Sequence, residues 1–251
     1  HAGKDNTPYS QGLHQKTYQP MKFKIKTPLG VYRYTMVPLF AGVKVIDKDI
    51  SRQNLAVFYD TLAASGIKVF LAYGTMLGAV REHDFISHDE DIDLAMSAIY
   101  REKLLAMLFK LRDIGFEVCR YDRRGVISFM KDGEYIDIYI FEKERDGVVA
   151  CGQEVMPECF IDDLAEYEFL GRRYLAPRDY ERYLRFWYGD NWKTPIQYYH
   201  YEMPMWRQKL LLAAQYIKEF LPDSLFYALL KRKMERYRAP YEKKIRDEYP
   251  V

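Results

Sequence analysis

Four carboxylates lie within five positions of this 251-residue chain, near the end of the stretch from Leu71 to Met96. They belong to Asp89, Glu90, Asp91 and Asp93. Acidic side chains this close repel one another unless a metal ion or a cationic substrate holds them. Apolar residues alternate with the last two acids, so the same segment also has to enter a hydrophobic core. The stretch is therefore a candidate site that constrains the fold around it.

The segment from Asp91 to Met96 has the alternating pattern of a β-strand. A period of two places Asp91 and Asp93 on one face, while the apolar residues between and after them enter the core. A further carboxylate, Asp137, lies in the apolar run from Tyr135 to Tyr139 and is costly to bury unless something binds it. Oxygen ligands of this kind select Mg²⁺ or Mn²⁺ over softer metals. We predict that the three aspartates bind such an ion, although a buried ion pair explains Asp137 almost equally well.

Phosphate contacts are predicted on the other side of the acids. Gly74 and Thr75 lie where a buried strand gives way to a short helix, and free backbone N–H groups at such a turn suit phosphate oxygens. Arg81, about two helical turns later, could add a bidentate contact. Asp89 and Glu90 are interpreted as a solvated, supporting rim. Each feature alone is weak, but their order and spacing together indicate phosphoryl or nucleotidyl transfer without a covalent nucleophile.

The remaining segments predict an α+β fold with a mixed sheet. Apolar residues recur at helical spacing from Asp49 until Gly66 ends the pattern, and again after Ser97. The dipeptide Asp132-Gly133 is a strong signal for a two-residue hairpin turn. An arm at residues 1–20 precedes a small hairpin formed by 22–27 and 31–37. The other predicted strands are 69–72, 91–96, 116–121, 126–131 and 134–141, and the main predicted helices are 49–66, 98–114, 178–188, 205–220 and 224–237.

Composition restricts the classes of function. A formal net charge of +2 does not indicate a general nucleic-acid-binding surface, and we expect no nucleic-acid partner. The three cysteines are an odd number without Cys-x-x-Cys spacing, which argues against a disulfide framework or a structural zinc site and favours a cytoplasmic setting. No run approaches the roughly 18 apolar residues of a membrane span.

Two separate motifs resemble the LicD/fukutin family of nucleotidyltransferase-fold phosphotransferases. The first comprises YGTMLGAVR at 73–81, Phe85-Ile86 and DEDID at 89–93; the second comprises Arg182-Tyr183-Leu184 and YGDNWKTP at 188–195. The sequence departs from the pattern at His88 and Glu90, where many relatives have Trp and Asp. The resemblance implies a nucleotidyltransferase-like mixed sheet flanked by helices. It divides the chain into an N-terminal arm and hairpin (1–45), a catalytic domain (46–200) and a C-terminal helical extension (201–251).

The resemblance also implies an activity. A substituted phosphate of the phosphocholine or polyol phosphate type would move from a CDP-linked donor to a hydroxyl of a cell-surface glycan or its lipid-linked precursor, as in lipopolysaccharide, capsule or teichoic acid, and CMP would leave. By that analogy Asp91, Asp93 and Asp137 hold Mg²⁺ or Mn²⁺, Asp137 is the nearest candidate proton acceptor, Gly74 and Thr75 meet the donor phosphates, and Arg81 steadies them.

Several interpretations stay open. Tyr188, Asp190 and Trp192 could form a wall for the acceptor or the donor group, although a helix C-cap with aromatic packing explains them slightly better. Residues 205–251, which are both apolar and basic, could contact the inner face of a membrane or pack on the catalytic domain. The alternatives in function are a nucleotidyltransferase that transfers NMP and releases pyrophosphate, and a non-catalytic scaffold that retains the fold.

Overall fold

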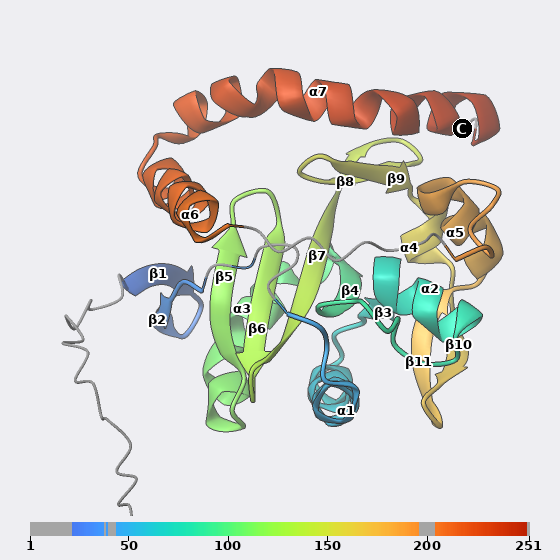
Figure 1. The fold of residues 1–251 in the computed structure, drawn as a ribbon, viewed down its shortest axis with the longest axis horizontal. Coiled ribbons are helices and arrows are strands. Elements are labelled where there is room, and N and C mark those ends of the chain that lie inside the picture. The colour runs from blue at the N-terminus through green and yellow to red at the C-terminus, as the bar shows by residue number, and fades with distance from the viewer. Residues whose placement is uncertain (1–21, 38, 40–43, 196–203, 250–251) are drawn as a thin grey trace, which may run out of the picture.

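The computed structural model describes residues 22–37, 39, 44–195 and 204–249 (Figure 1). The predicted arm at 1–20 and the predicted domain boundary at 200 lie outside these residues. The strands are β1 Lys22–Thr27, β2 Gly30–Thr35, β3 Phe70–Leu71, β4 Ile92–Ser97, β5 Glu117–Asp122, β6 Val126–Lys131, β7 Glu134–Arg145, β8 Val148–Cys151, β9 Glu154–Pro157, β10 Leu164–Phe169 and β11 Arg172–Pro177. The helices are α1 Lys48–Ala64, α2 Tyr73–Arg81, α3 Arg101–Asp113, α4 Cys159–Asp162, α5 Tyr180–Tyr188, α6 Met205–Glu219 and α7 Asp223–Glu248, with a 3₁₀ turn at Ala98–Tyr100.

A mixed sheet is the centre of the fold, which confirms the α+β prediction. Its main path runs β10-β11-β3-β4-β7-β6-β5, and β8 and β9 extend it from the far end of β7. β4 runs parallel to β7 and antiparallel to β3. Helix α1 packs against β7 and helix α3 against β5; in Figure 1 α3 lies behind β5 and β6, and α1 is seen end-on below the strands. β1 and β2 form a separate antiparallel hairpin, as predicted.

Local sequence signals explain several element ends. Asp47 caps α1, because its Oδ1 accepts hydrogen bonds from the N–H groups of Asp49 and Ile50, each at 3.1 Å. The Asp132-Gly133 turn has φ values of 52° and 81°, and positive φ at both positions is what a type I′ hairpin requires. This turn joins β6 to β7 and fixes their register.

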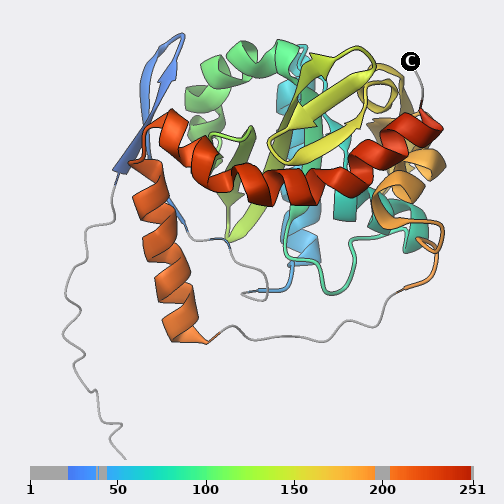
Figure 2. The same ribbon diagram turned by 90° about the horizontal axis from the view of Figure 1, so that it is seen from above.

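The last helix is longer than predicted. The expected end at residue 237 is wrong, because α7 continues through Pro240 to Glu248. Tertiary contacts hold this last segment: Ile245 is buried, the Tyr241 ring contacts Trp187, and Lys244 Nζ donates to the Phe186 carbonyl at 2.7 Å. Figure 2 shows α7 crossing the molecule and α6 running at an angle to it on the same side. Among the described residues, none of the helices is both long and apolar enough to cross a membrane.

Candidate active site

The sheet brings the three predicted aspartates together. Asp93 in β4 is directly opposite Asp137 in β7, and Asp91 immediately precedes β4. One carboxylate oxygen from each of these three residues lies within 4.8 Å of the others. Because β4 and β7 are neighbouring parallel strands, residues distant in sequence come to adjacent positions on one face.

Burial makes the charge of this cluster expensive. Asp93 and Asp137 are only 7% and 2% exposed. Burial raises the pKa of Asp91 well above its usual range, and the charges of Asp137 and Asp89 raise it further. Burial likewise raises the pKa of Asp93, with Asp91 and Asp89 adding to the effect. A divalent cation among these oxygens would remove this penalty, so the cluster has the electrostatic character of a metal site.

Gly74 and Thr75 contact the acids directly. The Gly74 N–H donates to Asp93 Oδ2 at 3.0 Å, and Thr75 Oγ1 accepts a hydrogen bond from the Asp93 N–H at 2.8 Å. A Cβ atom at position 74 would lie 2.6 Å from Asp89 Oδ2 and 3.2 Å from Asp93 Oδ2, so the site needs glycine here. The first turn of α2 therefore positions Asp93 and lets Asp89 approach.

Asp89 and Arg81 differ in their relation to the cluster. Burial raises the pKa of Asp89 to about 6, and its carboxylate adjoins the first turn of α2, so Asp89 is closer to the acids than an exposed rim would be. Glu90 is half-buried beside it. Arg81, in contrast, ends α2 and pairs with Glu82 at 2.8 Å. Seven residues of helix place its backbone about 10 Å along the axis from Gly74. Among the described residues its ion-pair partner is Glu82, and its contact with donor phosphates stays a prediction.

The sequence motifs did not predict Arg120 in β5, which is the cation beside the aspartate cluster. One of its terminal guanidinium nitrogens pairs with Asp137 Oδ2, and its Nε donates to Ser128 Oγ at 2.8 Å. The strand register places these residues in one row, because Arg120 is opposite Ser128, Ser128 opposite Asp137, and Asp137 opposite Asp93. Although burial lowers the pKa of Arg120, the Asp137 charge raises it overall, so the guanidinium stays charged.

The second oxygen of Asp137 tests whether a metal fits. Oδ1 is buried, and the described residues offer it no hydrogen-bond partner. An unpartnered buried carboxylate oxygen is rare and costly. Since Arg120 takes Oδ2, Oδ1 remains to join the oxygens of Asp91 and Asp93. The donor set fits a divalent cation that prefers oxygen ligands, and these three residues could hold it.

The structure places the three residues of the predicted wall, Tyr188, Asp190 and Trp192, in different environments. Burial and the charge of Asp93 raise the pKa of Tyr188 well above its usual range, while the residue as a whole is 41% exposed at the end of α5. Trp192 is only 5% exposed and belongs to the core. Asp190 extends into solvent and pairs with Arg185 at 3.4 Å. Gly189, with φ of 81°, caps α5, as the packing interpretation expects.

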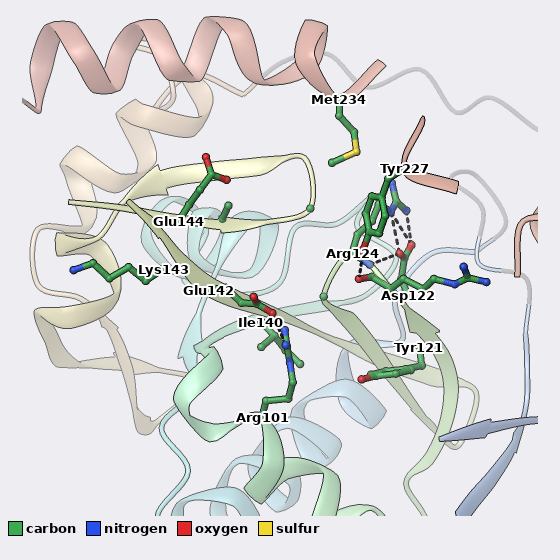
Figure 3. Close-up of a pocket in the computed structure, with 14 residues that line it drawn as sticks. Arg101, Tyr121, Asp122, Arg124, Ile140, Glu142, Lys143, Glu144, Tyr227 and Met234 are labelled. Atoms are coloured by element: carbon green, nitrogen blue, oxygen red, sulfur yellow. Dashed lines mark hydrogen bonds and ion pairs between the residues drawn. The ribbon is translucent and has the colours of Figure 1, made fainter. Parts of the chain in front are cut away.

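Two polar cavities lie beyond Arg120. A cavity of about 150 Å³ is bounded by Arg120, Tyr139, Arg124 and Glu154. A larger one of about 330 Å³ lies under α7 and is drawn in Figure 3, where Arg124 pairs with Asp122 near Tyr227. Both cavities are lined by Asp122 and Arg124. None of the three clustered aspartates lines either cavity, but Arg120, which pairs with Asp137, lines the smaller one.

A known protein family matches the part of the chain that contains the clustered aspartates. Residues 66–179 match the family described as LicD/FKTN/FKRP, nucleotidyltransferase domain. This segment is a LicD domain. It contains the Gly-Thr turn, all three clustered aspartates and Arg120. The match confirms the family resemblance of the first motif at 73–93, whereas the second motif at 182–195 lies beyond the matched residues.

Individual proteins that resemble this chain do so at low identity. The uncharacterized protein RT0683 of Rickettsia typhi is 25% identical over 126 residues, which cover 48% of this chain and 40% of that protein, so this chain spans less than half of the relative. The lincosamide antibiotic adenylyltransferase LnuA bound to lincomycin has a TM-score of 0.40 at 19% identity, over 53% of this chain and 84% of that one. The complex of ANT(2")-Ia with adenylyl-2"-tobramycin has a TM-score of 0.42 at 18% identity, over 77% and 98%. At these scores the similarities say nothing about the substrate of the LicD domain.

Proposed function

We propose that this protein transfers a substituted phosphate, of the phosphocholine or polyol phosphate type, from a CDP-linked donor to an acceptor hydroxyl, with release of CMP. The acceptor hydroxyl would belong to a cell-surface glycan or to the lipid-linked precursor of that glycan. The observation that supports the proposal most is the cluster of Asp91, Asp93 and Asp137 inside a LicD domain, where Asp137 Oδ1 is buried and has no hydrogen-bond partner among the described residues. Such a carboxylate set is what metal-assisted phosphoryl transfer needs.

Asp91, Asp93 and Asp137 would hold Mg²⁺ or Mn²⁺. When bound, such an ion supplies charge neutralisation for the phosphates and a lower pKa for the attacking hydroxyl. The protein itself supplies the positions of the ligands, because Gly74 and Thr75 fix Asp93 and Arg120 fixes Asp137. Contact of Gly74, Thr75 and Arg81 with donor phosphates stays a prediction.

The chain's thiols support direct transfer without a covalent intermediate. Cys119 and Cys151 are the cysteines nearest to the Arg120 side of the site, and both are buried. Burial raises the pKa of each to about 12, which leaves almost no thiolate at neutral pH. Neither thiol is therefore suited to form a covalent intermediate, which agrees with direct attack of the acceptor hydroxyl on the phosphate. Asp137 Oδ2 is paired with Arg120, and Oδ1 is the oxygen left for the metal, so the proton-acceptor role for Asp137 competes with metal binding and stays a prediction.

Thermal melting with Mg²⁺ and each of CDP-choline, CDP-glycerol and CDP-ribitol tests the proposal first, because a bound donor stabilises the folded protein. CMP release by chromatography, with a glycan acceptor added, then tests transfer. Asp91→Asn should abolish the release while leaving the protein folded. Pyrophosphate release from a nucleoside triphosphate would instead establish the NMP-transfer alternative. No stabilisation by any nucleotide and no turnover would establish a scaffold.

A further inference from the structure

Helix α6 exposes an apolar stripe. The stripe consists of four large apolar residues at helical spacing, with Ala213 between them: Trp206, Leu210, Ile217 and Phe220. Their exposed fractions are 61–68%. In a helix of a globular protein such a stripe normally faces the core. An exposed contiguous apolar surface of this kind marks an interaction site.

The stripe is not the side by which α6 attaches to the protein. Tyr216 stacks on Phe23 of β1 at a centroid distance of 5.9 Å, and Tyr216 is half-buried. Since Ile217 follows Tyr216 by one residue, it is rotated by about 100° around the helix. Only Phe220, at one end, also reaches Phe23, at 6.3 Å. Among the described residues, the rest of the stripe faces solvent.

Helix α7, which follows α6 in the chain, adds a basic surface. Its inner side is occupied by the buried residues Phe226 and Ile245, which pack on the domain. The opposite side begins with the exposed residues Leu225 and Leu229. Basic residues continue the same face at helical spacing, and all are exposed: Arg232, Arg236 and Lys243. Figure 2 shows α6 and α7 joined at one end and both visible from the same side of the molecule.

The charge of this region selects the kind of partner. Residues 205–251 contain eleven Lys and Arg against six Asp and Glu, a formal charge of +5, although the whole chain carries only +2. Two copies of this surface would repel one another, which disfavours self-association. A flat anionic surface with an apolar interior satisfies both features, because the stripe can enter the acyl boundary while Lys and Arg meet the head groups.

We propose that the α6 stripe and the outer face of α7 bind the surface of an anionic lipid bilayer. Each basic residue near such a surface contributes roughly a fivefold gain in partitioning. Removal of three should therefore weaken binding by about two orders of magnitude. The interaction needs neither the metal nor the donor, so it does not depend on the proposed activity.

Vesicle flotation of the full chain tests the proposal, with phosphatidylcholine vesicles compared with vesicles in which about one quarter is phosphatidylglycerol. The apolar variant is W206S/L210S/I217S, and the charge variant is R232Q/R236Q/K243Q. Ile99→Ser is the matched control, because Ile99 is 79% exposed but lies outside α6 and α7. We expect the protein and the control to float only with the anionic vesicles, and both triple variants to remain in solution. Circular dichroism checks that every variant is folded.

Tryptophan emission gives a second measurement. Trp187 and Trp192 are buried, whereas Trp206 is exposed, so a blue shift on adding anionic vesicles reports the α6 stripe. Asp91→Asn should show the same shift, which separates this proposal from the catalytic one. Equal flotation of all variants, or no blue shift, would overturn the proposal. A dimer in light scattering without lipid that W206S/L210S/I217S converts to a monomer would assign the stripe to a second copy and also overturn it.

Discussion

Replacement of Arg120 by methionine should destabilise the protein strongly. The Asp137 side chain is 3% exposed and pairs with Arg120, so the substitution leaves a buried carboxylate without its cation. Breaking a buried ion pair from one side costs about 3–5 kcal/mol of unfolding free energy. Arg173→Met is the matched control, because Arg173 forms an exposed pair with Glu166 at 3.0 Å. Its loss should cost less than about 1 kcal/mol.

Guanidinium denaturation of a double-mutant cycle measures this effect. Asp137→Asn alone leaves Arg120 without its carboxylate, whereas R120M/D137N removes both charges. The double variant should therefore lose less stability than the sum of the single losses, with a coupling of about 1–3 kcal/mol. Manganese should still stabilise Arg120→Met, since all three carboxylates remain, but not the variants that lack Asp137. A loss below about 1 kcal/mol for Arg120→Met, or simple additivity in the cycle, would refute the positioning role of Arg120.

Three further predictions concern the acid cluster. The pKa values of Asp89, Asp91 and Asp93 are raised in the metal-free fold, that of Asp89 to about 6, so the folded state binds more protons than the unfolded chain at mildly acidic pH. The stability that these protonated carboxyl groups contribute is present at low pH and is lost as pH rises through their pKa values. Stabilisation by Mn²⁺ should instead grow with pH. Equal increases in melting temperature on adding Mn²⁺ at pH 5 and at pH 7.5 would contradict this prediction. Gly74→Ala should abolish Mn²⁺ binding in calorimetry without unfolding the protein, because the new Cβ displaces the Asp89 and Asp93 carboxylates; an unchanged affinity would contradict it. Asp91→Asn should remove the Mn²⁺-dependent rise in melting temperature yet keep or increase metal-free stability, because it relieves like-charge repulsion.

The predicted fold was most accurate where the sequence carries a strong local signal. The Asp132-Gly133 turn requires positive φ at two successive residues, so it specified both the existence and the pairing of β6 and β7. The end of α7 was wrong for the opposite reason. The helix continues through Pro240, because packing of Ile245 on the core outweighs the backbone hydrogen bond that proline cannot donate.

The candidate site was predictable only in part. Alternation with apolar residues correctly indicated that Asp91, Asp93 and Asp137 share one face of a sheet. Arg81 was predicted on the phosphate side of the site, and that role stays a prediction. A helix separates its two ends, so Arg81 lies near Glu82, away from the first turn of α2.

Arg120 escaped prediction because a bulge brings it to the acids. Before the bulge, Val118 in β5 is opposite Phe129 in β6, and unbroken pairing would next place Cys119 opposite Ser128. The register instead shifts between Val118 and Arg120, so Arg120 takes that place. A slip of one residue moves a side chain to the other face of a strand, and a bulge introduces such a slip. Without it the guanidinium would point away from the aspartate row. The bulge in β5 is therefore the structural reason that Arg120 contacts Asp137. The motifs used in the sequence analysis did not predict this bulge.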